Sequence, residues 1–258
     1  TWYSVISDVV FARIGAVMAV TSPRVTSLAI GQEISPEELG GWKLHTEVTG
    51  LVDQAFDTDE EVLDAVSRFL SYLPSHNGQE PPAAAVPDGS ADDQDKILDI
   101  VPTERQRVYD VRRVLRVISD NDSLFELKSR FGRAVVTALA RIGVRTVGFL
   151  ANNPLVKGGA IDPDACDKAV SFMILCDSFN RPMVSMVDQP GVFIGLEGER
   201  KRAPGKIMNW MNAHALVTVP RFAVIMRKSY GQAYLNMGGG RNADETLIWP
   251  TADLGFME

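Results

Sequence analysis

Strand-like and helical patterns alternate in the second half of the chain, and this order predicts an α/β fold. Apolar runs typical of buried strands lie at 183–187 and 221–226, and a helix is expected between them from about 204 to 216. Repeated strand–helix–strand units form a parallel sheet with right-handed crossovers. In such sheets ligands bind in the loops that follow the carboxyl ends of the strands. A functional site is therefore expected in the loops at 188–202 and 228–240.

The residues before these strands extend the pattern. Two strand-like runs, 134–140 and 144–150, are separated by a short segment that contains Gly143, which predicts a hairpin. Asp110 and Asp162 each precede apolar residues at helical spacing, which predicts a helix after each of them.

The loop at 228–240 is the strongest candidate for a chemical role. It follows an apolar strand, contains glycines and leads into what reads as the start of a helix. The first N–H groups of a helix have no partner within it, so such a turn can stabilise an oxygen that gains negative charge. A site of this kind needs no catalytic side chain, and no ordinary catalytic triad is evident here. Many glycine-containing turns merely connect a strand to a helix, so the pattern alone leaves that alternative open.

Two other loops contain residues that could line the same crevice. The loop at 188–202 has several glycines, which allow a ligand to approach the backbone closely. The loop that follows the strand-like run 144–150 carries Gly158 and Gly159. Asp188 is either a general base or, as is commoner for an aspartate at the end of a strand, a cap for the next turn. The basic cluster 200–202 either contacts phosphate groups or is simply solvated.

Composition argues against several functional classes. The 258 residues are 45% hydrophobic and 23% charged, an average globular composition. A formal net charge of −7 argues against a nucleic-acid-binding protein, which usually has a basic patch. No apolar run reaches transmembrane length, the N-terminus has no signal-peptide pattern, and the Cys and His residues have no zinc-binding spacing. We expect a cytoplasmic protein with reduced cysteines, no metal, and no nucleic-acid or membrane partner.

Composition also predicts two domains, 1–76 and 99–258. Residues 77–98 between them are rich in Pro, Ala and acidic residues and contain almost no large apolar residue, which is typical of a linker. A long surface loop within one domain is the alternative.

In the first of these domains, strand-like runs occur at 4–20, and capping signals at 35–38 and 58–61 predict two helices. Residues 1–18 are weakly similar to 232–257: both have an aromatic turn, an acidic residue, an apolar strand and a second short strand. This similarity suggests two copies of one unit.

Several short motifs follow one another along nearly the whole chain. They are 38–41 with His45, 69–74, 159–162 leading to 167–169, 176–182, 187–191, 227–234 and 249–252. In this order and spacing, they resemble the carboxyltransferase (β) subunits of biotin-dependent acyl-CoA carboxylases, of the propionyl-CoA carboxylase type. Order and spacing together are far more specific than any single motif.

The resemblance implies an α/β crotonase-like fold, in which each of two domains is a β-β-α superhelix. In this family the active site forms between the first domain of one subunit and the second domain of another, and each domain contributes one oxyanion hole. One hole polarises the acyl-CoA thioester, and the other holds the ureido oxygen of biotin. The resemblance assigns the biotin-side hole to Gly231, Gln232 and Ala233 as catalytic residues. It gives as substrate-binding residues Gly158, Gly159, Gly191, Val192 and Leu235, the last at a position that influences acyl-chain preference.

The family's activity is the transfer of CO2 from carboxybiotin to the α-carbon of an acyl-CoA through enolate intermediates. The biotin anion left after loss of CO2 removes the α-proton, and backbone N–H groups stabilise both oxyanions, which explains why no side-chain base is visible. The resemblance further implies a biotin carboxylase or biotin carboxyl carrier partner, biotin carried on that partner, and dimers assembled into a hexamer.

Two departures from the family pattern are visible. Gln232 stands where the family usually has glycine, and a φ above zero there would be costly. The sequence begins just after the expected first oxyanion hole and ends where the family continues, so we expect it to be truncated at both ends and inactive alone. Two alternatives to the carboxylase remain: the α subunit of a biotin-dependent acyl-CoA decarboxylase, which catalyses the reverse reaction, and a non-catalytic scaffold relative.

Overall fold

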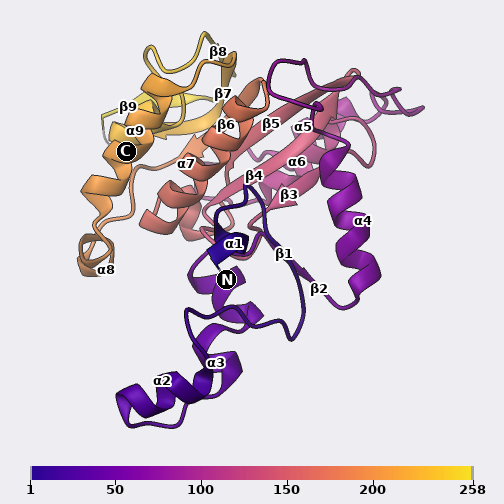
Figure 1. The fold of residues 1–258 in the computed structure, drawn as a ribbon. Coiled ribbons are helices and arrows are strands. Elements are labelled where there is room, and N and C mark those ends of the chain that lie inside the picture. Colours follow the sequence, from indigo (N-terminus) through magenta and orange to yellow (C-terminus); the bar gives the residue numbers. More distant parts are fainter. Residues whose placement is uncertain (1, 257–258) are drawn as a thin grey trace. The chain divides into compact units, whose positions relative to one another are not determined.

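The computed structural model describes residues 2–256, which form two compact units (Figure 1). The first unit contains the chain up to Leu70 together with Lys128–Phe131, and the second contains Ser71–Leu127 and the chain from Gly132 onward. Residues 71–93 include neither helix nor strand.

The linker expected at 77–98 falls inside the second unit. The domain boundaries expected from composition, 1–76 and 99–258, stay a prediction. The outer ends of the two similar stretches, residues 1 and 257, lie outside the described residues.

The first unit is built from short elements around a small aromatic core. The ring of Phe11 packs edge-on against the rings of Phe56 and Phe69, with centroids 6.1 and 6.0 Å away. Its two strands pair in parallel. The elements are α1 (Trp2–Val5), β1 (Phe11–Arg13), α2 (Pro23–Ile30), α3 (Pro36–Gly40), the π-helix η1 (Leu44–Val48), β2 (Gln54–Phe56) and α4 (Asp59–Leu70).

Both helix starts predicted in this unit are confirmed. The Ser35 hydroxyl accepts from the backbone N–H of Glu38, and the Glu38 carboxylate accepts from that of Ser35, which is the expected capping box. The strand-like runs expected at 4–20 are wrong except at β1, because the first residues form α1 and only a single bridge at Val17 follows β1. Short apolar runs fit a helix or a strand equally well, so periodicity could not separate the two.

The second unit is a seven-stranded mixed sheet with helices on both faces. The strand order is β3-β4-β5-β6-β7-β8, and β9 also pairs with β7. Its helices are η2 (Gln94–Lys96), α5 (Ile97–Ile100), α6 (Val111–Ile118), η3 (Lys157–Gly159), α7 (Pro163–Ser178), α8 (Leu196–Arg200), α9 (Ala203–Leu216) and α10 (Gly231–Asn236). Its strands are β3 (Phe125–Leu127), β4 (Val135–Ile142), β5 (Arg145–Asn152), β6 (Met183–Gln189), β7 (Arg221–Tyr230), β8 (Glu245–Ile248) and β9 (Asp253–Gly255).

The predicted strands and helices of this unit are confirmed, but the sheet is only partly parallel. The pairs from β5 to β8 are parallel, whereas β3, β4 and β5 are antiparallel. The predicted hairpin joins β4 to β5 through Gly143 and Val144, which both have positive φ, 52° and 73°. A two-residue hairpin turn with both residues left-handed matches the twist of the strands.

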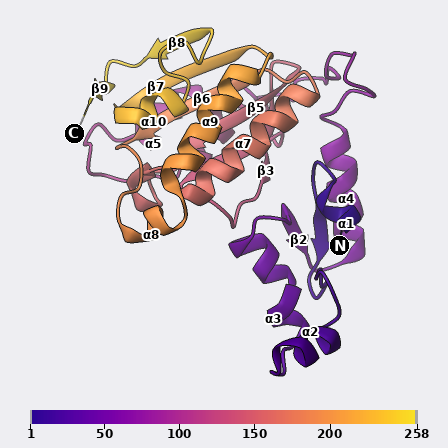
Figure 2. The same cartoon turned by 60° about the vertical axis from the view of Figure 1, so that its left-hand side comes forward.

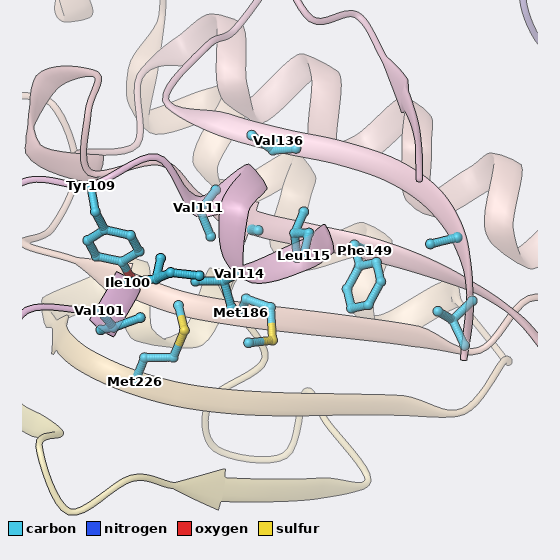
Figure 3. Close-up of a cluster of buried hydrophobic side chains, with 13 residues drawn as sticks. Ile100, Val101, Tyr109, Val111, Val114, Leu115, Val136, Phe149, Met186 and Met226 are labelled. Atoms are coloured by element: carbon cyan, nitrogen blue, oxygen red, sulfur yellow. The ribbon is translucent and has the colours of Figure 1, made fainter. Parts of the chain in front are cut away.

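Successive residues of β5 point to opposite faces of the sheet, and different helices cover these two faces. A Cβ added to Gly148 would lie 2.4 Å from Cys176 Sγ, so this residue faces α7. Its neighbours Val147 and Phe149 point to the other face and join a buried cluster with α5 and α6 (Figure 3). Helices α7 and α9 pack side by side on the first face (Figure 2). The sheet is thus a central layer between two helical ones.

Candidate functional site

The carboxyl ends of three neighbouring strands bring the predicted loops to one edge of the sheet. Strands β5, β6 and β7 are parallel neighbours, so the loops after Asn152, Gln189 and Tyr230 leave the sheet on the same side. The Gln189 side-chain amide donates to the Tyr230 carbonyl at 3.3 Å. This hydrogen bond joins the start of the second loop, after β6, to the start of the third loop, after β7. This is the edge at which open α/β sheets bind ligands.

The third loop is the turn from β7 into α10. Tyr230 is extended, Gly231 has φ 58°, and α10 begins at Gly231. Only glycine adopts this left-handed conformation without strain. The backbone N–H groups of Gln232 and Ala233 belong to the first turn of α10, where no partner within the helix is available.

Gln232 itself causes no backbone strain. It is not among the residues with positive φ, because Gly231 provides the left-handed step. Its side chain is exposed, while Ala233 is buried. The backbone strain expected from a glutamine at this position is therefore absent, and the N–H of Gln232 is retained as a hydrogen-bond donor.

The first loop contains three consecutive left-handed residues. Lys157, Gly158 and Gly159 have φ values of 52°, 64° and 87°. A Cβ on Gly159 would lie 2.5 Å from the Asp188 carbonyl oxygen, so only glycine lets this loop approach the end of β6. Lys157 Nζ lies 2.8 Å from the Asp162 carboxylate and 4.3 Å from the centre of the Phe193 ring, which anchors the loop on both sides.

The second loop pairs with the segment that follows the first. Ile161 and Val192 form a parallel bridge. The Ile161 N–H donates to the Gly191 carbonyl at 3.1 Å, and the Phe193 N–H donates to the Ile161 carbonyl at 2.8 Å. The structure therefore places the segment that carries Gly158 and Gly159 beside the loop that carries Gly191 and Val192, four residues that the resemblance assigned to substrate binding. The fifth such residue, Leu235, is half-buried on α10.

Asp188, which the sequence left open as a base or a cap, is held in a buried ion pair. Its Oδ2 accepts from Arg227 Nε at 2.8 Å and from the Tyr109 hydroxyl at 3.0 Å, and all three residues are buried. Burial, and then the charge of Asp188, raise the pKa of Tyr109 well above its usual range. Asp188 is therefore a structural group, and sequence reasoning missed both of its partners because they are 39 and 79 residues away.

Two further groups that the sequence singled out are the basic cluster at 200–202 and the two cysteines. In the basic cluster 200–202, Lys201 pairs with Asp164 at 2.7 Å, and its neighbours are exposed. Cys166 and Cys176 are free and buried, and burial raises the pKa of each thiol to about 12. Within residues 2–256, no group of three His, Cys, Asp or Glu side chains could hold a metal ion. No helix in that range is both long and apolar enough to cross a membrane.

Comparison with known proteins shows one family along the whole chain. The model of the carboxyl transferase domain matches residues 1–258. The chain is 36% identical over 241 residues to the propionyl-CoA carboxylase, carboxyltransferase subunit, of Haloferax mediterranei, which covers 93% of this chain and 47% of that relative. It is 31% identical over 241 residues to the methylmalonyl-CoA decarboxylase subunit alpha of Veillonella parvula, with the same shares covered.

A solved structure agrees. The crystal structure of transcarboxylase 12S, described as a hexamer assembly with methylmalonyl-coenzyme A and methylmalonic acid bound, matches with a TM-score of 0.92 at 33% identity. The match covers 98% of this chain and 49% of that one. The chain thus spans about half the length of the relatives it matches.

Proposed function

This chain belongs to the carboxyl transferase family, and from that premise we propose that it acts in the carboxyltransferase component of a biotin-dependent acyl-CoA carboxylase. Its α/β sheet is the crotonase-like fold expected from the sequence. The proposed reaction transfers CO2 from carboxybiotin to the α-carbon of a propionyl-CoA-like acyl-CoA.

The observation that carries this proposal is the turn at the start of α10. Gly231, Gln232 and Ala233 place helix N-terminal N–H groups at the carboxyl end of β7, and no titratable side chain occurs among them. A neutral, strongly accepting oxygen such as that of the biotin ureido group fits a set of donors alone. These three residues are therefore the proposed catalytic residues, with Gly231 shaping the turn and the other two donating hydrogen bonds.

In the proposed reaction, the chain's own residues stabilise negative charge, and the base is not a side chain of this protein. Carboxybiotin supplies the CO2 and, once that has left, the base for the α-proton of the acyl-CoA. The N–H groups of Gln232 and Ala233 hold the negative charge that develops on the oxygen in front of them. Because these donors are fixed by the backbone, they need no reorganisation during the reaction, and removal of one such donor typically costs about 10²–10³ in kcat.

The acyl-CoA is proposed to lie along the neighbouring loops. Val192 bridges to Ile161, and Gly159 lies against the Asp188 carbonyl. Nothing lies within 4 Å of a Cβ placed on Gly158 or Gly191, so the main chain at these two glycines is open to a ligand. Leu235 follows the turn on α10 and is half-buried, so it offers an apolar surface to an acyl tail rather than to a polar group.

The proposed biotin partner is a biotin carboxylase or biotin carboxyl carrier subunit, because the chain resembles subunits of such complexes. We also propose a homo-oligomer, dimers assembled into a hexamer, since the 12S relative is described as a hexamer assembly. A cytoplasmic location completes the proposal. Two carboxyltransferase domains, meeting at the linker 77–98, are the proposed organisation.

A decarboxylase is the second candidate. The relative from Veillonella parvula is named a methylmalonyl-CoA decarboxylase subunit, and it matches the same share of this chain as the carboxylase subunit does. The same turn would serve the reverse direction, since one transition state is stabilised both ways. Gln232 was one reason to consider the scaffold alternative. That reason no longer holds, because Gln232 does not strain the turn.

The test is an assay of the full-length protein with its biotin-carrying partner. We expect transfer of labelled carboxylate from the carboxylated partner to propionyl-CoA, with lower rates for longer and polar acyl-CoAs. Decarboxylation of methylmalonyl-CoA without ATP-driven carboxylation would favour the second candidate. If calorimetry detects binding of neither biotin nor propionyl-CoA, only the scaffold alternative remains.

A further inference from the structure

One buried network of charges joins the ends of three strands. The Asp188 side chain is 0% exposed and that of Arg227 2%, and their Oδ2 and Nε atoms are 2.8 Å apart. Asp188 Oδ1 accepts from the Lys228 N–H at 3.3 Å, and the Asp188 N–H donates to Asn152 Oδ1 at 3.2 Å. The end of β6 is therefore tied to β7 on one side and to β5 on the other.

The same network also anchors the segment before α6. Arg227 Nη1 lies 2.8–3.1 Å from three backbone carbonyls, those of Pro102, Glu104 and Arg107. Tyr109, whose hydroxyl donates to Asp188, lies at one end of the buried hydrophobic cluster, near Ile100 and Val101 (Figure 3). A guanidinium that fills several acceptors in this way fixes the segment firmly.

Each loop of the proposed site starts within a few residues of this network. Asp188 precedes Gly191 by three residues, and Arg227 precedes Gly231 by four. The backbone carbonyl of Asp188 is the atom against which Gly159 is packed. Any shift of Asp188 must therefore move all three loops.

Stability alone is a poor reason for such a pair. Two buried charges lose their hydration, and apolar residues of similar volume often stabilise a core equally well or better. A network that joins four segments by hydrogen bonds does, however, favour one arrangement of those segments, even though Arg227 Nη2 and Asn152 Nδ2 have no hydrogen-bond partner. That property is valuable where backbone donors must be held in a fixed geometry.

We propose that Asp188, with Arg227 and Tyr109, is a positioning group that sets the turn at 231–233 against the loops at 157–159 and 190–193. Asp188 touches no substrate and acts only through the backbone. The consequence for catalysis rests on the proposed function, whereas the placement of the three loops does not.

The first test follows the backbone directly. Hydrogen exchange is measured on the full-length protein carrying Asp188→Asn, with Asp120→Asn as the matched control. Asp120 is also buried, but it accepts from Gly143 and Val144 at the hairpin turn, at the opposite end of β5. We expect amides in 156–161, 189–193 and 228–236 to exchange at least about tenfold faster in Asp188→Asn only. Unchanged exchange in these peptides, or equal acceleration in the control, would overturn the proposal.

The second test follows catalysis in the complex with the biotin-carrying partner. Asp188→Asn is expected to lower kcat about 10–100-fold with the KM for propionyl-CoA within about twofold, since small misplacements of catalytic groups have effects of this size. Tyr109→Phe, which removes one hydrogen bond and leaves the ion pair, should lower kcat less and keeps the test valid if Asp188→Asn does not fold. A control that loses kcat equally would contradict positioning. An inactive wild-type complex would refute the proposed function, and the exchange measurement would still decide the positioning.

Discussion

Single residues decide how closely the loops of the proposed site approach one another. Gly158 and Gly159 are both left-handed, but they differ in what surrounds them. Nothing lies within 4 Å of a Cβ placed on Gly158, whereas a Cβ on Gly159 would overlap the backbone of Asp188. Backbone cannot move aside as a flexible side chain does. Gly158 is thus required only for its φ, and Gly159 for its φ and for space.

This difference predicts unequal effects of two alanine substitutions. Gly158→Ala should destabilise the protein by about 1–2 kcal/mol, the usual cost of a left-handed alanine. Gly159→Ala should cost about 1–3 kcal/mol more, because the loop must also move away from β6. Urea unfolding of the two variants measures both values. Equal losses would show that the overlap with Asp188 is relieved without cost.

At the scale of elements, the sequence predicted the β4–β5 hairpin only in part and did not reveal the contact between α9 and α10. The hairpin was predictable from its two apolar runs and Gly143, but not the left-handed Val144, because a β-branched residue is rarely found with positive φ. His214 on α9 donates from Nε2 to the Asn236 carbonyl at the end of α10 at 2.7 Å. A contact between side chain and backbone over 22 residues leaves no periodic signal in the sequence.

Relieving the strain at Val144 should stabilise the hairpin. Val144→Asn is expected to raise the free energy of unfolding by about 0.5–1.5 kcal/mol, since asparagine tolerates the left-handed region better than a β-branched residue. Val144→Ala, which keeps a Cβ in the same conformation without branching, serves as the comparison and should gain less. Thermal denaturation reports both changes. A destabilised Val144→Asn variant would mean that the exposed valine makes contacts worth more than its strain.

His214 predicts a loss of stability in mild acid. Burial lowers its pKa from the ordinary value of 6.5, so the folded protein keeps the imidazole neutral where the unfolded chain binds a proton. The free energy of unfolding should therefore be unaffected by this group above pH 6.5 and should fall as the pH decreases below it. In His214→Gln, that component of the slope between pH 6.5 and 5 should disappear. An identical pH dependence in both proteins would show that folding does not lower the pKa of His214.

At the scale of the whole molecule, the sequence predicted which loops lie at one edge of the sheet better than it predicted the contacts that hold them there. Motifs that follow apolar strands indicated the carboxyl edge of the sheet, and the structure places the loops that carry four of the predicted residues beside each other there. The antiparallel pairing of β3 with β4 and the pairing of Asp188 with Tyr109 and Arg227 were not predictable. They depend on which distant segments meet, and apolar periodicity carries no such information.

A backbone N–H at the start of α10 is the group on which the proposed carboxyl transfer depends most, and one pair of variants isolates its effect. Gln232→Pro removes the N–H, and proline is tolerated in the first turn of a helix. Gln232→Ala removes the same exposed side chain and keeps the N–H. Each full-length variant is assayed with its biotin-carrying partner and propionyl-CoA. We predict that kcat falls about 10²–10³-fold in Gln232→Pro at a similar melting temperature and stays within about threefold of wild type in Gln232→Ala. Equal kcat in the two variants would show that the N–H of residue 232 has no role in catalysis.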